Sequence, residues 1–232
     1  MVGAYAARGS TGFGAAAAMP LLGLVLPLKL LIPAWTIVGA LAGLALFGSD
    51  RKNVAWREMT RLLPGLLVGI AVGLWIFTQL DSATLTKGLG VLVLLYGLYS
   101  LWGTFRKAAK PKVPPNIAAA VGGFFGGIVG TIVGTMGSVF FAIYYDAIHL
   151  AKENFRATMT AILLTLAVVR GIGYWAVGEY TRDVMILSAI LFPMMLVGIF
   201  IGNRFHHGMS ELVFRRAVSA ALVASGLALL VK

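Results

Sequence analysis

The sequence predicts an all-α protein that crosses a membrane several times, and three observations support this class. Apolar residues make up 59% of the chain and charged residues 12%, whereas a soluble domain has about 45–50% and about 25%. Apolar runs such as 62–80 and 89–102 approach the roughly 20 residues that span a bilayer as a helix. The strands of a β-barrel would instead give alternating segments of about ten residues, and the sequence contains none.

Apolar segments follow one another with short connections, which leave no room for an ATPase domain. We expect helical segments at about 3–27, 29–48, 61–80, 84–105, 117–148, 155–178, 183–203 and 211–231. The basic stretch 106–115 contains prolines that stop helices on both sides. The sequence therefore predicts a first transmembrane repeat (1–105), a cytoplasmic basic linker (106–116) and a second transmembrane repeat (117–232).

The net charge of +11 comes from short basic clusters between the apolar segments. This distribution favours the positive-inside rule over nucleic-acid binding. It places the loop after residue 48 and the linker in the cytoplasm, and the loop 81–87 outside. If 117–148 crossed only once, the arginine-rich loop after residue 203 would lie outside. We therefore expect 117–148 to enter from the cytoplasm, break at its glycines and return.

Two stretches of the chain resemble each other closely. LLPGLLVGIAVGLW at 62–75 and LFPMMLVGIFIGNR at 191–204 share seven of fourteen residues at an offset of 129. GSTG at 9–12 corresponds to GTMG at 134–137 at an offset of 125. With one broken segment and three spanning helices in each half, the second repeat begins on the opposite face. We expect two inverted repeats, a plan typical of secondary transporters with a site where the repeats meet.

The two glycine breaks are the predicted substrate-binding site. Broken backbone is tolerated at membrane depth only where protein buries it or a wet cavity receives it. The N-terminus of a half-helix offers free N–H groups to an oxyanion, and hydroxyls flank both breaks. The predicted binding residues are Gly9, Ser10, Thr11, Gly12, Gly134, Thr135, Gly137 and Ser138. The glycines of 65–73 indicate close helix packing instead.

Two charged residues have alternative interpretations. Arg170, within an apolar run, either supplies a fixed positive charge to the anion or extends to the outer interface. We include it among the substrate-binding residues. Asp146 either carries a coupling proton, or caps the next helix or pairs with Lys152 or Arg156. The chain has no cysteine, which excludes disulfides and thiol catalysis. No metal ligand cluster or cofactor motif is present, and we expect no cofactor.

The pattern resembles the TauE/SafE sulfite-exporter family, also called the toluene-sulfonate uptake permeases. The resemblance rests on GSTGFGAAAAMP at 9–20, GTMGSVFF at 134–141 and RATMTAILL at 156–164. It implies a multi-pass permease of the bacterial inner membrane that carries small sulfonate or sulfite-type anions. The alternatives are a passive anion channel and a permease for another carboxylate or oxyanion. A membrane enzyme is disfavoured because the acids show no paired motif. Exposed glycine faces favour a homodimer.

Overall fold

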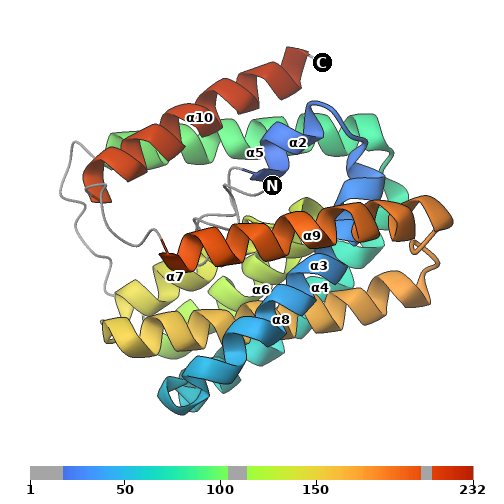
Figure 1. Cartoon of the computed structure of the whole chain (residues 1–232). Helices are drawn as coiled ribbons and strands as arrows, with labels where there is room; N and C mark the ends of the chain where they lie inside the picture. Colours follow the sequence, from blue (N-terminus) through green and yellow to red (C-terminus); the bar gives the residue numbers. More distant parts are fainter. Residues whose placement is uncertain (1–17, 104–113, 205–210, 232) are drawn as a thin grey trace.

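The computed structural model describes residues 18–103, 114–204 and 211–231, which form helices with short connections and no β-strand (Figure 1). The long helices are α3 (Leu28–Asp50), α4 (Trp56–Gln79), α5 (Ser82–Gly103), α6 (Pro115–Val133), α8 (Lys152–Ala176), α9 (Arg182–Arg204) and α10 (Glu211–Val231). The short elements are α2 (Ala18–Gly23), the 3₁₀-helix η2 (Arg51–Asn53) and α7 (Gly137–Ala147). The predicted all-α class is therefore confirmed.

Local chemistry explains where several helices begin. α6 starts at Pro115, a residue type that suits the first helical position because its missing N–H would have no partner there. The N–H of Thr84 donates to Oδ1 of Asp81 at 3.0 Å, which caps α5. The N–H of Val184 donates to the hydroxyl of Thr181 at 3.4 Å at the start of α9.

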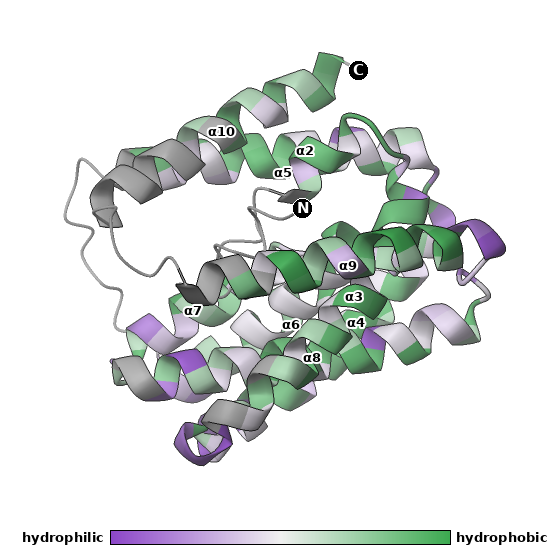
Figure 2. Ribbon diagram, viewed as in Figure 1, coloured by the Kyte–Doolittle hydropathy of each residue, from purple (hydrophilic) through white to green (hydrophobic). Residues whose placement is uncertain are grey.

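Five of the described helices are long and apolar enough to cross a membrane, namely α3, α4, α5, α6 and α8. In Figure 2, hydrophobic residues cover the middle of the helices and hydrophilic residues gather at helix ends, for example where α3 ends. Large side chains such as Trp75, Leu95 and Phe200 are exposed on the outside of the bundle. A lipid environment suits such a surface, and the chain is a multi-pass membrane protein.

The expected break in segment 117–148 is present. α6 ends at Val133 and α7 begins at Gly137, and α7 folds back along α6. A Cβ added at Gly130 would lie 3.5 Å from Cα of Gly137, and one added at Gly122 would lie 3.6 Å from Cβ of Tyr144. The two helices therefore form an antiparallel hairpin, and α7 ends on the side where α6 begins.

Small residues bring α6 close to α4. A Cβ added at Gly65 would lie 2.5 Å from the carbonyl oxygen of Ala120, and one added at Gly73 would lie 2.9 Å from Cβ of Thr131. The residue numbers of the facing positions increase in the same direction along both helices, so α4 and α6 run parallel. The close packing predicted for glycines 65–73 is confirmed, and the partner is the second half of the chain.

Two further helix pairs run antiparallel. α5 and α10 lie side by side at the top of Figure 1, where Gly90 faces Gly226 and Gly97 faces Val223. Gly43 of α3 packs against Leu164 of α8, and Lys29 at the start of α3 lies 3.2 Å from Glu179 just after α8, so this pair is antiparallel as well. The directions of these pairs place the starts of α4, α6, α8 and α10 at one end of the bundle. We call this the inner end, because Arg51, Lys52, Arg57 and Arg61 gather there.

Candidate functional site

The break between α6 and α7 is formed by Gly134, Thr135 and Met136. Gly134 has a φ of +86° and a ψ of −32°, and its N–H donates to the carbonyl oxygen of Gly130 at 3.1 Å. An L side chain is strained at this φ, whereas glycine adopts it readily. This glycine ends α6 after Val133 and lets the chain turn back into α7.

Two side chains of α8 close the C-terminal end of α6. Nη1 of Arg170 donates to the carbonyl oxygens of Gly130 and Gly134, to the latter at 3.0 Å. The hydroxyl of Tyr174 donates to the carbonyl oxygen of Thr131 at 2.5 Å. The two donors stand four residues apart and therefore share one face of α8. Together they bind three carbonyls in the last turn of α6 and at its C-cap, where a helix end leaves carbonyl groups short of intrahelical donors.

This geometry bears on the two interpretations of Arg170. The side chain is only 3% exposed and bonds to backbone carbonyls, so it does not extend to the outer surface. Its charge stands at the C-terminal end of α6, where the helix dipole is negative. Arginine within a membrane protein is stabilised by such carbonyl partners.

The start of α7 supplies polar groups on the other side of the break. N–H groups in the first turn of a helix have no intrahelical partner and carry partial positive charge. The hydroxyl of Ser138 donates to the carbonyl oxygen of Thr135 at 3.1 Å. Oγ1 of Thr135 is buried and has no hydrogen-bond partner among the described residues. The break thus combines a helix N-terminus with a buried hydroxyl whose hydrogen-bonding capacity is unused.

The first half of the chain also reaches this break. A Cβ added at Gly134 would lie 2.5 Å from Cε of Met19 and 3.6 Å from Cγ2 of Ile32. Met19 belongs to α2, which follows the predicted first break at 9–12. Met19, Ile32 and Val133 are buried in one apolar cluster. Segments from both halves therefore meet at the break.

The predicted site residues occupy different places in the fold. Arg170 contacts Gly134 directly, and Thr135, Gly137 and Ser138 follow Gly134 along the same turn. Residues 9–12 lie outside the described residues. Gly137 serves packing as well, because an added Cβ would lie 2.8 Å from Cα of Gly130.

Asp146 lies away from the break, near the end of α7. It is nine residues beyond Gly137, or about 14 Å along a helix axis. Its side chain is exposed, and its carbonyl oxygen accepts the N–H of His149 at 3.1 Å. A coupling role for Asp146 would therefore act at the inner end of the hairpin and not at the break.

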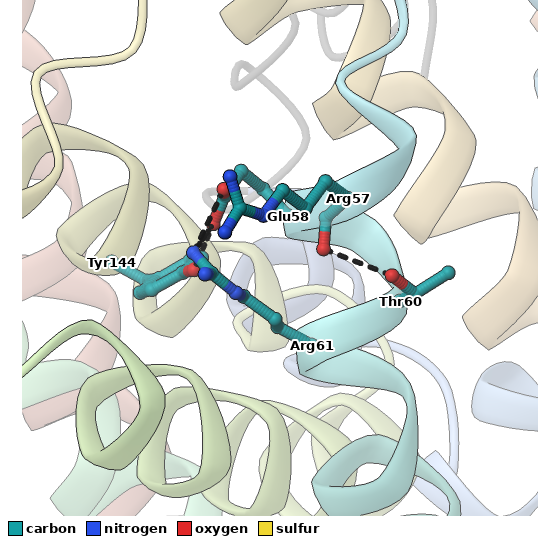
Figure 3. Close-up of polar contacts among 5 residues, drawn as sticks. All are labelled: Arg57, Glu58, Thr60, Arg61 and Tyr144. Carbon is teal, nitrogen blue, oxygen red and sulfur yellow. Dashed lines mark hydrogen bonds and ion pairs between the residues drawn. The ribbon is translucent and has the colours of Figure 1, made fainter.

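A second polar cluster joins the end of α7 to the first turns of α4 (Figure 3). The hydroxyl of Tyr144 donates to Oε2 of Glu58 at 2.5 Å. Nη1 of Arg61 donates to both carboxylate oxygens of Glu58 at 2.9 Å. Tyr144 is buried at 1% exposure. The cluster holds α7 against the inner end of α4.

Sequence reasoning did not identify Tyr174, Tyr144 or Glu58. The spacing of Arg170 and Tyr174 along one helix face was the available signal for the first. Glu58 and Arg61 show the spacing of a helical ion pair. Their tyrosine partner is 86 residues away from Glu58 and left no local signal.

A bundle of membrane-spanning helices with an interrupted helix and buried polar groups is an architecture that recurs among secondary membrane transporters. The profile of the sulfite exporter TauE/SafE family matches residues 1–229. The chain therefore belongs to the TauE/SafE family of transporters, which confirms the resemblance seen in the sequence. The family points to transport and not to an enzyme.

One similar protein is the probable inner membrane transporter protein TsaS of Comamonas testosteroni. The two chains are 26% identical over 184 residues, which cover 78% of this chain and 75% of the relative. No solved structure matches the chain.

Proposed function

We propose that the protein is a secondary permease for small organic sulfonate or sulfite-type anions, with its binding site at the break between α6 and α7. The observation that carries this proposal is the Arg170 clamp on the carbonyls of Gly130 and Gly134. Gly9, Ser10, Thr11 and Gly12 complete the site from the first half. By analogy with its named relative, the protein works in the bacterial inner membrane.

The contact between Arg170 and these two carbonyls supports anion binding because it changes the electrostatic field at the turn of the hairpin. Where α7 turns back along α6, the negative C-terminal end of α6 and the positive N-terminal end of α7 lie close together. Their fields would largely cancel. Arg170 binds the carbonyls of α6 and neutralises the negative end, so the positive end of α7 dominates the break. An oxyanion then binds the N–H groups at Gly137 and Ser138 and the hydroxyl of Thr135.

Transport proceeds by alternating access in this proposal. At an offset of 129, α3 corresponds to α8 and α5 corresponds to α10, and both pairs pack antiparallel. An axis in the membrane plane that relates two inverted repeats would produce this packing. Inward-open and outward-open states built from similar units have similar free energies. The repeat boundaries at residues 105 and 117, and a homodimeric assembly, belong to the same proposal.

Thermal shift of the purified protein tests the substrate class. Sulfite, sulfoacetate, taurine, aryl sulfonates, sulfate and carboxylates are screened separately. A ligand that binds only the folded state raises the melting temperature with its concentration, by mass action. Stabilisation by sulfonates or sulfite supports the proposal. Stabilisation by carboxylates alone would indicate that the substrate is a carboxylate and not a sulfonate. If no anion stabilises the protein, the proposed site is contradicted.

Flux into proteoliposomes distinguishes a permease from a channel. Uptake that saturates and is accelerated by substrate on the opposite side indicates alternating access. Linear flux without trans-stimulation would indicate a passive anion channel.

A further inference from the structure

An ion pair at the outer end of the bundle joins α3 to the loop that follows α8, and these belong to different halves of the chain. Nζ of Lys29, in the first turn of α3, lies 3.2 Å from Oε1 of Glu179, which follows α8. The two side chains are 27% and 20% exposed. The pair is therefore accessible to water from the outer side while partly covered by protein.

A column of aromatic side chains connects this ion pair to the break. Nζ of Lys29 lies 4.9 Å from the centroid of the Phe77 ring, within the range of a cation–π contact. The centroids of Phe77 and Tyr174 are 5.0 Å apart. The hydroxyl of Tyr174 in turn binds the carbonyl oxygen of Thr131, three residues before Gly134. Both rings are fully buried.

The ion pair is thus connected, through two tilted rings in contact with each other, to the last turn of α6 just before the break. α3, α4 and α8 each contribute one residue to this connection, through Lys29, Phe77 and Tyr174. A path from the outer side along this column requires α3 to move away from α8. The Lys29–Glu179 pair is the polar contact that such a movement must break.

The strength of the pair suits a contact that opens in every transport cycle. Ion pairs of this exposure change the equilibrium constant between two conformations by up to about fivefold. A contact of this size biases two states without locking either of them.

We propose that Lys29 and Glu179 form the outer gate of the transporter, which closes over Phe77 and Tyr174 and separates the break from the outer solution. This inference rests on the proposed function for its role in transport, because a gate implies a pathway to the break. The gate itself is a conformational property and can be measured without any substrate.

The test exploits the absence of cysteine from the chain. A single cysteine replaces Thr135 at the break, and its reaction with a membrane-impermeant maleimide is followed in right-side-out vesicles. We expect Lys29→Met and Glu179→Gln each to raise the labelling rate about two- to fivefold, the range of a partly exposed ion pair. The charge swap, Lys29→Glu with Glu179→Lys, should return the rate towards that of the parent.

Two controls make the result specific. Lys87→Met removes an exposed basic residue of α5 and should leave the labelling rate unchanged. Lys29→Arg keeps the pair and should do the same. If Lys29→Met fails to accumulate in the membrane, Glu179→Asp, which shortens the acid by one methylene, replaces it.

Equal labelling rates in the parent and in both single variants would overturn the gate, as would an equal increase in Lys87→Met. Failure of the proposed function has a different signature. In that case no anion is transported or stabilises the protein, while the labelling rates still respond to the ion pair.

Discussion

Arg170 is the charged residue of α8 that binds backbone carbonyls at the C-terminal end of α6. Its guanidinium group binds the carbonyls of Gly130 and Gly134 at the same time. At the offset that relates the two repeats, the position of Arg170 corresponds to Leu41. An equivalent arginine is therefore absent from the corresponding position of α3.

We predict that Arg170→Met destabilises the protein by about 1–3 kcal/mol, because it leaves two buried carbonyls without their charged donor. The same substitution should abolish stabilisation by the anion. Both effects are measured by thermal unfolding of the purified protein with and without ligand.

Tyr174→Phe is the matched control for that substitution. It removes one hydroxyl from the same face of α8 and should cost about 1 kcal/mol while anion stabilisation persists. Loss of anion stabilisation in both variants would mean that packing at α8 matters and the charge does not.

Gly134 is the second residue whose identity the structure explains. We predict that Gly134→Ala costs about 1–2 kcal/mol, because its φ of +86° strains an L side chain. Met19 adds little to this cost, since its terminal methyl group can move. Gly88→Ala is the control: an added Cβ meets nothing within 4 Å there, so the helix should gain slightly. Equal unfolding temperatures for the two variants would contradict this account.

At the scale of elements, the pair α4 and α6 depends on glycine. An added Cβ at Gly69 would overlap the carbonyl oxygen of Phe124, a backbone atom that can move only with its helix. We predict that Gly69→Ala separates the helices and destabilises the protein by about 1–3 kcal/mol. Thermal unfolding measures the loss. Gly48→Ala on α3, where the added Cβ has open space, is the control and should be close to neutral.

The helices themselves could be predicted from apolar runs, prolines and charge clusters. The expected segment 211–231 coincides with α10, and the broken segment 117–148 corresponds to α6 and α7. α4 begins at Trp56, five residues before the prediction, because its first turns carry Glu58 and Arg61 and resemble a loop. Hydrophobicity alone does not predict a first helical turn of polar residues whose side chains are paired through tertiary contacts, as Glu58 is with Tyr144.

The candidate site could be predicted only in part. The glycines and hydroxyls in the sequence predicted the break. The free-energy cost of a charge in an apolar run indicated Arg170 as a candidate residue. The acceptors of Arg170 and Tyr174 are backbone carbonyls 36 to 43 residues away. Any residue type supplies a carbonyl, so one sequence carries no signal for such a pair. The contacts among Lys29, Phe77 and Glu179 could not be predicted for a similar reason, since these residues come from α3, α4 and the loop after α8.

At the scale of the whole molecule, the arrangement of the helices predicts the sidedness of the loops. Single cysteines at Ala151, before α8, and at Gly208, between α9 and α10, should react with an impermeant maleimide from the cytoplasmic side only. A cysteine at Ala83, in the first turn of α5, should react from the outside only. Sealed vesicles of both orientations provide the measurement. Reaction of Ala151→Cys and Gly208→Cys from opposite sides would refute the return of α7 to the inner end.

The glycine face that α4 presents to α6 has a consequence for biosynthesis. α4 leaves the ribosome well before α6, and among the described residues the atoms nearest to Gly65, Gly69 and Gly73 all belong to α6. A nascent chain that stops near residue 103 would expose this surface to lipid or to the insertion machinery. The first half expressed alone should therefore be a substrate for quality-control proteolysis, and co-expression of the second half should rescue it.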